Sequence, residues 1–300
     1  MSQIGVYYET WSEKWTSDAT KTGLSLLDKP ITIVYLAFAS PDSKYVAGQK
    51  TFVNSGLSFC NDWNVVTKSI QILKQKGILV MLSVGGGSYW SNTKVFNASN
   101  CVALMNDLGC DGIDLDWENS ASKDYELTNA IASVKPLLNG KKLSFAGFGT
   151  GAYGKQAGDT YKGNAIDAMT KQGSNVDWIN IMAYDGGKNF DPLGSFAAYQ
   201  VYFKGPLLLG FEVGKQGWGD DLLTQEEVEK NCGVVKAQGK QNGIMIWANY
   251  KSNDGLTPST KDVIKTAGDI FNNSIPPPPV PAGYIFPCPN CKKEFKITIS

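Results

Sequence analysis

The sequence predicts an α/β fold, a TIM-type (β/α)8 barrel with a short proline-linked C-terminal tail, from its length and from a regular alternation of two kinds of segment. The chain has 300 residues, 42% of them hydrophobic, which is enough for one barrel of about 250 residues. Short apolar runs typical of strands buried on both faces alternate with stretches long enough for a helix. The runs are Ile4–Tyr8, Ile31–Ser40, Ile78–Gly86, Gly112–Glu118, Leu143–Phe148, Val176–Asp185, Leu207–Val213 and Ile244–Tyr250. Eight repeats of this alternation favour a closed parallel barrel over an open sheet.

Two of the intervening stretches carry clear helix signals. Residues 63–76 place apolar side chains at helical spacing before Gly77, and a glycine commonly follows the last turn of a helix. Residues 224–238 open with Thr-Gln-Glu-Glu, which resembles a capping box. We therefore expect helices over both stretches.

The composition changes abruptly near residue 273, where a proline-rich stretch begins. Such a stretch forms a semi-rigid spacer. We expect a barrel domain at 1–273, a proline-rich linker at 274–283 and a tail at 284–300 that is too short for a core of its own. Cys288 and Cys291 in the tail have the spacing of half a zinc site; a disulfide, free thiols and a metal shared between chains all stay open.

Charge and residue usage exclude several classes of function. Lysine plus arginine and aspartate plus glutamate number 28 each, so no long-range field would attract nucleic acid or an anionic membrane. The sequence has no histidine, which excludes Ser-His-Asp and Cys-His sites and histidine-bearing zinc sites. No run approaches the ~20 apolar residues of a membrane helix. Proton transfer therefore falls to carboxylates, tyrosine, lysine or cysteine.

Six cysteines are few for a chain of this length and form no dense framework. Cys101 and Cys110 are close enough in sequence to pair locally, and buried free thiols are an equal alternative. Residues 1–8 have neither a basic segment nor a long apolar segment, so no secretory signal is visible in this sequence.

The fourth apolar run carries the strongest chemical signal. Active sites of such barrels lie at the C-terminal ends of the strands, and here the run is Asp114-Leu-Asp116-Trp-Glu118, preceded by Asp111-Gly-Ile. Alternation along a strand directs Asp114, Asp116 and Glu118 to one face, towards the barrel axis. Buried neighbouring carboxylates raise one another's proton affinity and titrate together. We expect Glu118, the outermost, to be a general acid and Asp111, on the other face, to be structural.

A metal site and a solvated acidic loop are the alternatives for this row. The apolar residues Ile113, Leu115 and Trp117 between the acids disfavour a solvated loop, and we expect no metal.

The motif Asp-Gly-Ile-Asp-Leu-Asp-Trp-Glu at 111–118 resembles the signature of glycoside hydrolase family 18, the chitinases and related endo-β-N-acetylglucosaminidases. Ser-Val-Gly-Gly at 83–86, Met-Ala-Tyr-Asp at 182–185 and Trp247 are similar to further features of the family, each at the end of a predicted strand. The resemblance covers residues 4–250. The ends of the fifth run, at 146–148, and of the seventh, at 210–212, depart from the small or prolyl residues commoner in relatives.

The resemblance implies a retaining mechanism in which the enzyme supplies no nucleophile. The 2-acetamido oxygen of the substrate attacks the anomeric carbon, while Glu118 protonates the leaving oxygen and then activates water. Asp116 orients the acetamide, and Asp114 supports Asp116. Tyr184 hydrogen-bonds the acetamido oxygen, with Asp185 beside it.

The resemblance also implies a set of substrate-binding residues. Trp247 forms a floor beneath the sugar, because an indole stacks on the apolar face of a pyranose. The other members of the set are Tyr7, Phe38, Gly85, Gly86 and Met182. Aromatic side chains in predicted loops would extend the cleft; they are Trp11, Trp15, Tyr89, Trp90 and Trp218.

The function implied is hydrolysis of β-1,4-linked N-acetylglucosamine polymers. The expected partner is chitin or an N-acetylglucosamine oligosaccharide, with no cofactor, no nucleic acid, no membrane and a monomeric chain. Two alternatives stay open: an endo-β-N-acetylglucosaminidase of N-glycan cores, and a non-catalytic chitin-binding lectin. The family resemblance favours a secreted protein, because relatives often act outside cells. The sequence does not decide between endo and exo cleavage.

Overall fold

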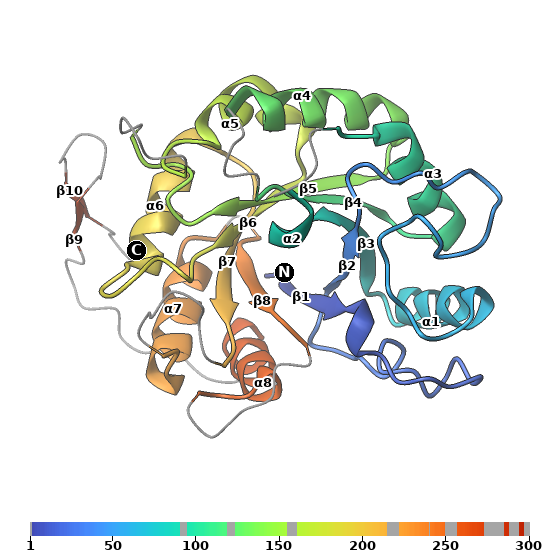
Figure 1. The fold of residues 1–300 in the computed structure, drawn as a ribbon. Helices are drawn as coiled ribbons and strands as arrows, with labels where there is room; N and C mark the ends of the chain where they lie inside the picture. The colour runs from blue at the N-terminus through green and yellow to red at the C-terminus, as the bar shows by residue number, and fades with distance from the viewer. Residues whose placement is uncertain are drawn as a thin grey trace.

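Among the described residues, eight parallel strands close into a barrel, which confirms the predicted fold (Figure 1). The computed structural model describes residues 2–90, 95–118, 124–154, 161–214, 222–239, 241–249, 257–272, 285–287 and 294–296. The strands are β1 Ile4–Glu9, β2 Ile33–Ala39, β3 Leu79–Gly85, β4 Gly112–Asp116, β5 Lys142–Phe148, β6 Trp178–Met182, β7 Leu207–Glu212 and β8 Gly243–Trp247. Each strand pairs with its sequence neighbour, and β8 pairs with β1 to complete the ring.

Helices follow the strands and surround the barrel (Figure 1). They are α1 Trp63–Gln75, α2 Gly87–Trp90, α3 Ala98–Leu108, α4 Asp124–Val134, α5 Ile166–Gln172, α6 Pro192–Tyr202, α7 Gln225–Ala237 and α8 Thr260–Phe271, with short 3-10 turns η1 Thr10–Ser12, η2 Lys135–Leu137 and η3 Gly173–Asn175. The expected helices 63–76 and 224–238 agree with α1 and α7 to within one residue at each end. The capping box is confirmed, because Thr224 and Glu227 hydrogen-bond reciprocally.

Alternation along the strands divides the apolar side chains into two layers. Ile113 and Leu115 on β4 belong to the layer between barrel and helices. The barrel interior holds a second cluster, which includes Tyr35, Met81, Trp178, Leu208 and Met245. Asp114, an inward residue of β4, is therefore enclosed by packed side chains.

Six strands end earlier than the apolar runs suggested: β2, β3 and β7 by one residue, β4 by two, and β6 and β8 by three. Trp117 and Glu118 follow β4, and Tyr184 and Asp185 follow β6. The second run, 31–40, narrows to Ile33–Ala39. The apolar pattern in the sequence continues beyond the last hydrogen-bonded residue of the strand because loop side chains at the barrel mouth are also buried. Trp117, for example, is 5% exposed.

The described cysteines Cys60, Cys101, Cys110 and Cys232 are free thiols. Of the two alternatives for Cys101 and Cys110, the structure therefore shows free thiols and not a disulfide. Burial raises the pKa of both thiols to about 12, so they stay protonated and pack as small apolar groups.

The described part of the tail is a two-stranded antiparallel ladder of β9 Ile285–Pro287 and β10 Glu294–Lys296. Cys288, Cys291 and the predicted linker 274–283 lie outside the described residues, and the division into barrel, linker and tail stays a prediction. Within the described ranges, none of the helices combines the length and apolarity needed to span a bilayer.

Gly243 lies where β8 meets β1 and closes the barrel. A Cβ there would lie 1.9 Å from the backbone oxygen of Gln3, which accepts a 2.9 Å hydrogen bond from Ile244 N–H. We expect Gly243→Ala to lower the free energy of unfolding by about 2 kcal/mol or more, because overpacking forces backbone shifts.

Gly173→Ala is the matched control in urea or thermal denaturation. Gly173 has φ −56°, and its added Cβ would meet no atom closer than 3.6 Å. We expect a change within about 0.5 kcal/mol. Equal stabilities of the two variants would contradict the packing described at the β8–β1 closure.

Candidate active site

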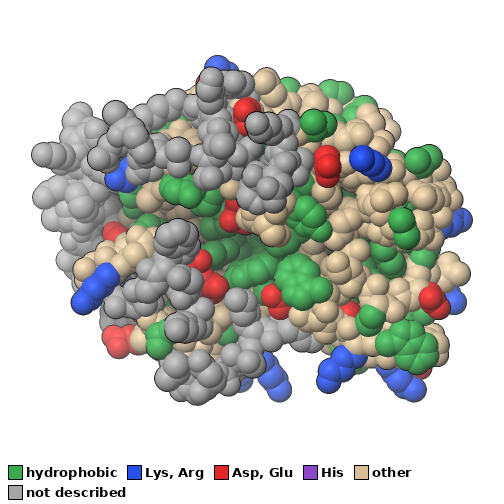
Figure 2. Space-filling model, in the orientation of Figure 1, with side chains coloured by type: hydrophobic (Ala, Val, Ile, Leu, Met, Phe, Trp, Pro, Cys, Tyr) green, Lys and Arg blue, Asp and Glu red, His purple; other side chains and the backbone are tan. Residues whose placement is uncertain are grey.

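A cavity of about 450 Å³ opens at the C-terminal ends of the strands. Figure 2 shows the hollow, with hydrophobic side chains inside it and acidic side chains beside it. The described residues that line it are Tyr7, Trp11, Phe38, Gly56, Ser58, Gly87, Ser88, Tyr89, Asp116, Glu118, Met182, Tyr184, Asp185 and Trp247. This set contains three carboxylates and five aromatic rings besides Phe38, and neither lysine nor arginine is among them. The cavity therefore suits a neutral ligand with apolar faces.

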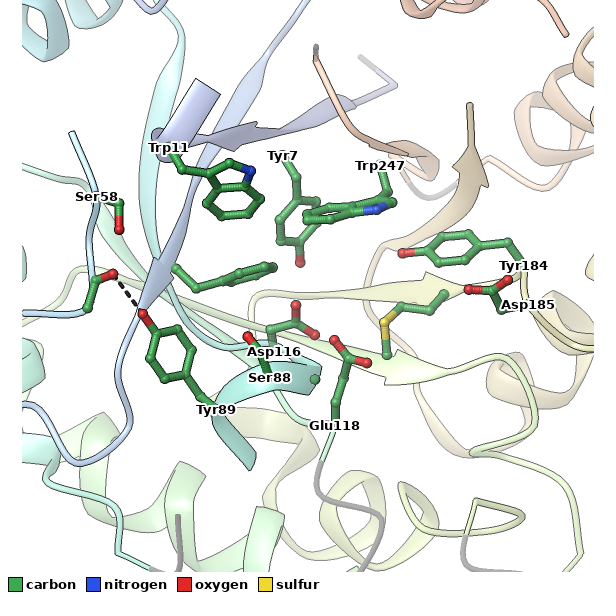
Figure 3. A pocket seen from close by; sticks show the side chains of 14 residues that line it. Tyr7, Trp11, Ser58, Ser88, Tyr89, Asp116, Glu118, Tyr184, Asp185 and Trp247 are labelled. Atoms are coloured by element: carbon green, nitrogen blue, oxygen red, sulfur yellow. Dashed lines mark hydrogen bonds between the residues drawn. The ribbon is translucent and has the colours of Figure 1, made fainter. Parts of the chain in front are cut away.

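The carboxylate row of β4 faces the barrel interior, as the alternation predicts. Asp114 is 0% and Asp116 3% exposed, while Glu118 is partly exposed at the cavity wall. Figure 3 shows the carboxyl groups of Asp116 and Glu118 pointing into the same hollow. Asp114 lies one step deeper and does not line the cavity.

Asp114 is held by four side-chain donors. Tyr7 Oη and Ser83 Oγ each donate to Oδ2 at 2.8 Å, and Ser144 Oγ and Asn180 Nδ2 donate to Oδ1 at 2.7 and 3.1 Å. Burial raises the pKa of Asp114, and these four hydrogen bonds oppose the rise. A carboxylate with all its acceptor positions used is stabilised in its charged form.

Asp116 and Glu118 form the proton-holding part of the row. Burial, then the charge of Glu118, then that of Asp114 raise the pKa of Asp116 well above its usual range. Burial also raises the pKa of Glu118, the charge of Asp185 adds to this, and the backbone N–H of Gly87 opposes it by donating to the carboxylate. The pair therefore retains a proton to a higher pH than isolated carboxyls would.

Tyr184 faces this pair from the end of β6 (Figure 3). Burial and the charges of Asp116, Glu212 and Glu118 raise the pKa of its phenol well above 10. The hydroxyl therefore remains a proton donor at all ordinary pH values. Gly210 on β7 makes room for the ring, because a Cβ there would lie 3.0 Å from Tyr184 Cε1.

Aromatic rings form one continuous wall of the cavity. Phe38 stacks on Trp247 with centroids 5.6 Å apart, and Tyr7 meets Trp247 edge-on at 5.9 Å. Trp11, which is 50% exposed, continues the wall outward, 6.3 Å from Phe38 and 6.4 Å from Trp247. Tyr89 donates its hydroxyl to Gly56 O at 2.7 Å at the outer end (Figure 3).

The structure brings most of the predicted site residues together. Tyr7, Phe38, Met182, Tyr184, Asp185 and Trp247 line the cavity with Asp116 and Glu118. Gly85 and Gly86 lie just behind the lining: Gly86 has φ +83°, and a Cβ there would lie 2.8 Å from the Phe38 ring. The missing side chain at Gly86 leaves room for Phe38. The predicted contact of Gly85 and Gly86 with substrate stays a prediction.

The loop aromatics separate into two groups. Trp11 and Tyr89 line the cavity, whereas Trp15 is 69% exposed and is not part of the lining. Trp218 and the side chain of Trp90 lie outside the described residues. Asp111 is structural as predicted, because it accepts from Val80 N–H at 2.9 Å and pairs with Lys74 at 2.7 Å.

Sequence reasoning missed Gly56, Ser58 and Ser88, which line the cavity, and four further residues that lie beneath or beside it. Ser144 and Tyr35 lie inside the barrel, Trp178 donates to Tyr35, and Glu212 is 5% exposed close to Tyr184. Each has the inward parity of its strand, so the alternation that revealed the row of β4 applies to them too. Within the part of the chain that the structure describes, no three His, Cys, Asp or Glu side chains are grouped as metal ligands.

The arrangement supports general acid–base chemistry on a ring-shaped substrate. Glu118 can donate and recover a proton, Asp116 shares the charge of the pair, and the Tyr184 phenol donates to an oxygen that becomes negative or polarised. The aromatic wall offers a flat face for a sugar ring.

Comparison with known proteins agrees with this chemistry. Residues 3–207 match the family model described as glycosyl hydrolases family 18. Chitinase 1 of Aphanocladium album is 28% identical over 264 residues, which cover 68% of this chain and 61% of that protein. Endochitinase 1 of Metarhizium anisopliae is 29% identical over 146 residues, which cover 42% of this chain and 34% of that protein. The chain thus spans less than two thirds of the length of either relative.

The fold is similar to that of a solved fungal endo-β-N-acetylglucosaminidase from glycosyl hydrolase family 18. The TM-score is 0.67 at 16% identity, over 92% of this chain and 100% of that one. The family match runs from β1 to the start of β7 and includes the carboxylate row and the Tyr184–Asp185 pair. The chain belongs to the glycosyl hydrolases of family 18.

Proposed function

We propose that the protein hydrolyses β-1,4-linked N-acetylglucosamine polymers, chitin and its oligosaccharides, by a retaining mechanism in which the substrate supplies the nucleophile. The observation that carries the proposal is the meeting of Asp116, Glu118 and Tyr184 in one cavity that the Trp247 ring also lines (Figure 3). In this proposal the chain acts as a monomer.

Glu118 is the proton donor in the first step. It is the outermost acid of the row, and its raised pKa keeps it protonated where an isolated glutamate would be charged. As the glycosidic C–O bond breaks, the leaving oxygen takes the proton of Glu118 while the 2-acetamido oxygen bonds to the anomeric carbon. In the second step the Glu118 carboxylate takes a proton from water, and the water oxygen replaces the acetamido oxygen.

Asp116 and Tyr184 act on the acetamido group. The Asp116 carboxylate accepts from the acetamide N–H and stabilises the positive charge that develops on the cyclic intermediate. The phenol of Tyr184, held protonated by its surroundings, donates to the acetamido oxygen and orients it for attack. Fixed groups of this kind lower the barrier because they need no reorganisation during the reaction.

Chitin is favoured over other acetamido sugars by the length of the aromatic wall. Beyond Trp247 the wall continues through Phe38 to the half-exposed Trp11, which supports stacking of successive units of an unbranched chain. The two curated relatives compared above are named Endochitinase 1 and Chitinase 1. A binding-only role is disfavoured because Glu118 and its partner Asp116 are both in place.

A product profile on chitin oligomers of defined length, with detection of the anomer first released, tests the proposal. We expect hydrolysis with the β-anomer appearing first, because the acetamido oxygen and then water attack in succession. Release of the α-anomer would contradict the acetamide-assisted route. Activity only on a high-mannose glycoprotein would replace chitin by the N-glycan core as substrate.

Glu118→Gln tests the proton donor. Glutamine keeps the size of the side chain but carries no transferable carboxyl proton, so we expect the rate to fall by about 10²–10⁴-fold. The Kd for a chitin oligosaccharide, measured by calorimetry, should change little. Glu226→Gln on the exposed start of α7 is the control and should keep full activity. Unaltered turnover by Glu118→Gln would remove Glu118 from this role.

Asp185→Asn tests the electrostatic origin of the Glu118 pKa. The charge of Asp185 raises that pKa, so neutralising it stabilises the Glu118 carboxylate and lets the proton leave at lower pH. We expect the alkaline limb of kcat/KM against pH to move down by about half a unit to one unit. Asp62→Asn, at the N-cap of α1, should leave the limb in place; an upward or absent shift in Asp185→Asn would refute the assignment.

A further inference from the structure

A chain of hydrogen bonds crosses the barrel interior below the cavity and ends on Asp114. Trp178 Nε1 donates to Tyr35 Oη at 2.8 Å, and Tyr35 Oη donates to Asn180 Oδ1 at 2.9 Å. Asn180 Nδ2 then donates to Asp114 Oδ1 at 3.1 Å. All four side chains are at most 2% exposed, so water does not compete for these bonds. We refer to Trp178, Tyr35 and Asn180 as the relay.

The donors and acceptors of the relay have a fixed order. An indole N–H can only donate, so Tyr35 must accept from Trp178, and its own proton is then available for Asn180. The Asn180 oxygen therefore faces Tyr35, which leaves its NH₂ group facing Asp114. A reversed amide would place an oxygen against the Asp114 carboxylate and would lose both bonds.

The ring of Tyr35 is fixed by packing independently of its hydroxyl. It stacks on Tyr7 with centroids 4.6 Å apart. On the β1 side, a Cβ at Gly5 would lie 2.8 Å from Tyr35 Cε2, so only glycine leaves space for the ring there. Removing the hydroxyl alone should therefore leave the ring in place.

Few groups near Asp114 can change their charge. Tyr7 and Tyr35 face it from β1 and β2, and burial raises the pKa of both phenols well above 10. Ser83 and Ser144, its neighbours in register on β3 and β5, do not titrate. From β7 and β8 the barrel interior receives the apolar Leu208 and Met245. Among the described side chains facing Asp114, Asp116 is the carboxyl group whose pKa burial and the charges of Glu118 and Asp114 raise well above its usual range.

We propose that Tyr35, anchored by Trp178, is a positioning residue that holds the Asn180 amide in the orientation in which it donates to Asp114. Asp114 is then kept negative, and the proton of the carboxylate row stays with Asp116 and Glu118. Of the four donors to Asp114, the hydroxyls of Tyr7, Ser83 and Ser144 can rotate. Asn180 can switch from donor to acceptor, and Tyr35 prevents that switch.

Tyr35→Phe removes the hydroxyl and keeps the ring. Without this hydroxyl the Asn180 amide is no longer held with its NH₂ group towards Asp114. Loss of the Asn180 donor destabilises the charged form of Asp114, so the Asp114 carboxyl holds its proton to a higher pH. We expect the acid limb of kcat/KM against pH on chitin oligomers to move up by about one unit, since a hydrogen bond to a charged group is worth about tenfold or more in an equilibrium constant. The kinetic readout rests on the proposed function.

Tyr45→Phe is the matched control. Tyr45 is also 0% exposed, and its hydroxyl also makes two hydrogen bonds, donating to Asp107 Oδ2 at 2.6 Å and accepting from Lys50 N–H at 3.1 Å. It lies outside the barrel interior, in the layer under the helices. We expect it to lose stability as Tyr35→Phe does and to keep the wild-type acid limb.

Asn180→Ala tests whether Tyr35 shifts the acid limb through Asn180. If Tyr35 acts through Asn180, the acid limb of Asn180→Ala should not move further when Tyr35→Phe is added, so the two shifts are not additive. Additive shifts, an unmoved limb in Tyr35→Phe, or a Tyr35→Phe chain that fails to fold where Tyr45→Phe folds would each overturn the proposal.

A ¹³C-carboxyl NMR titration of the aspartates separates this proposal from the proposed function. The Asp114 signal is identified by its loss in Asp114→Asn, and we expect its midpoint to move up in Tyr35→Phe and not in Tyr45→Phe. If the wild-type protein leaves chitin oligomers intact but Tyr35→Phe shows this shift, the proposed function is refuted and the relay is retained. If the wild-type protein is active on chitin but Tyr35→Phe shows no shift, the relay is refuted and the proposed function is retained.

Discussion

The alternation of three carboxyl groups along β4 and the residues that follow it, two of them buried, is the constraint on which the rest of the barrel interior depends. Like charges in a low-dielectric interior are costly unless donors or protons compensate them. The neighbouring strands compensate the deepest group directly: Asp114 receives four donors from β1, β3, β5 and β6. Asp116 and Glu118, nearer the mouth, are compensated by retaining a proton instead. Asp114 is thus stabilised in its charged form by hydrogen bonds, and Asp116 and Glu118 hold the proton that the proposed reaction uses.

This division explains how one strand can provide an acid without a histidine anywhere in the sequence. The proton affinity of the outer pair rises because both groups are buried; the charges of Glu118 and Asp114 add to the rise at Asp116, and the charge of Asp185 adds to it at Glu118. Burial and the charges of Asp116, Glu212 and Glu118 keep Tyr184 protonated as a donor. The aromatic wall of Phe38, Trp247 and Trp11 adds a binding surface that carries no charge. In the proposed reaction the positive intermediate therefore forms among groups that are already arranged to stabilise it.

The sequence was sufficient for the fold and for the row on β4, because both follow from periodicities within single segments. Period-two alternation assigned Asp114, Asp116 and Glu118 to one face, and helical spacing identified α1. The family resemblance supplied Tyr184, Asp185 and Trp247, which lie in other strands. Local pattern could not supply the relay: Tyr35 and Asn180 are 145 positions apart, and their contact depends on the ring dimensions and register of the closed barrel. Glu212 was visible only as a departure from relatives, and its position beside Tyr184 required the structure.

The protons of the carboxylate row lie on Asp116 or Glu118 and not on Asp114 if the donors around Asp114 act as proposed. Neutron diffraction from a crystal of the deuterated protein, grown at the pH of maximal activity, would locate them directly. We predict no deuterium on Asp114, deuterium on the four groups that donate to it, and one deuterium held by Asp116 or Glu118. Deuterium on the Asp114 carboxyl, or none on either Asp116 or Glu118, would contradict the account.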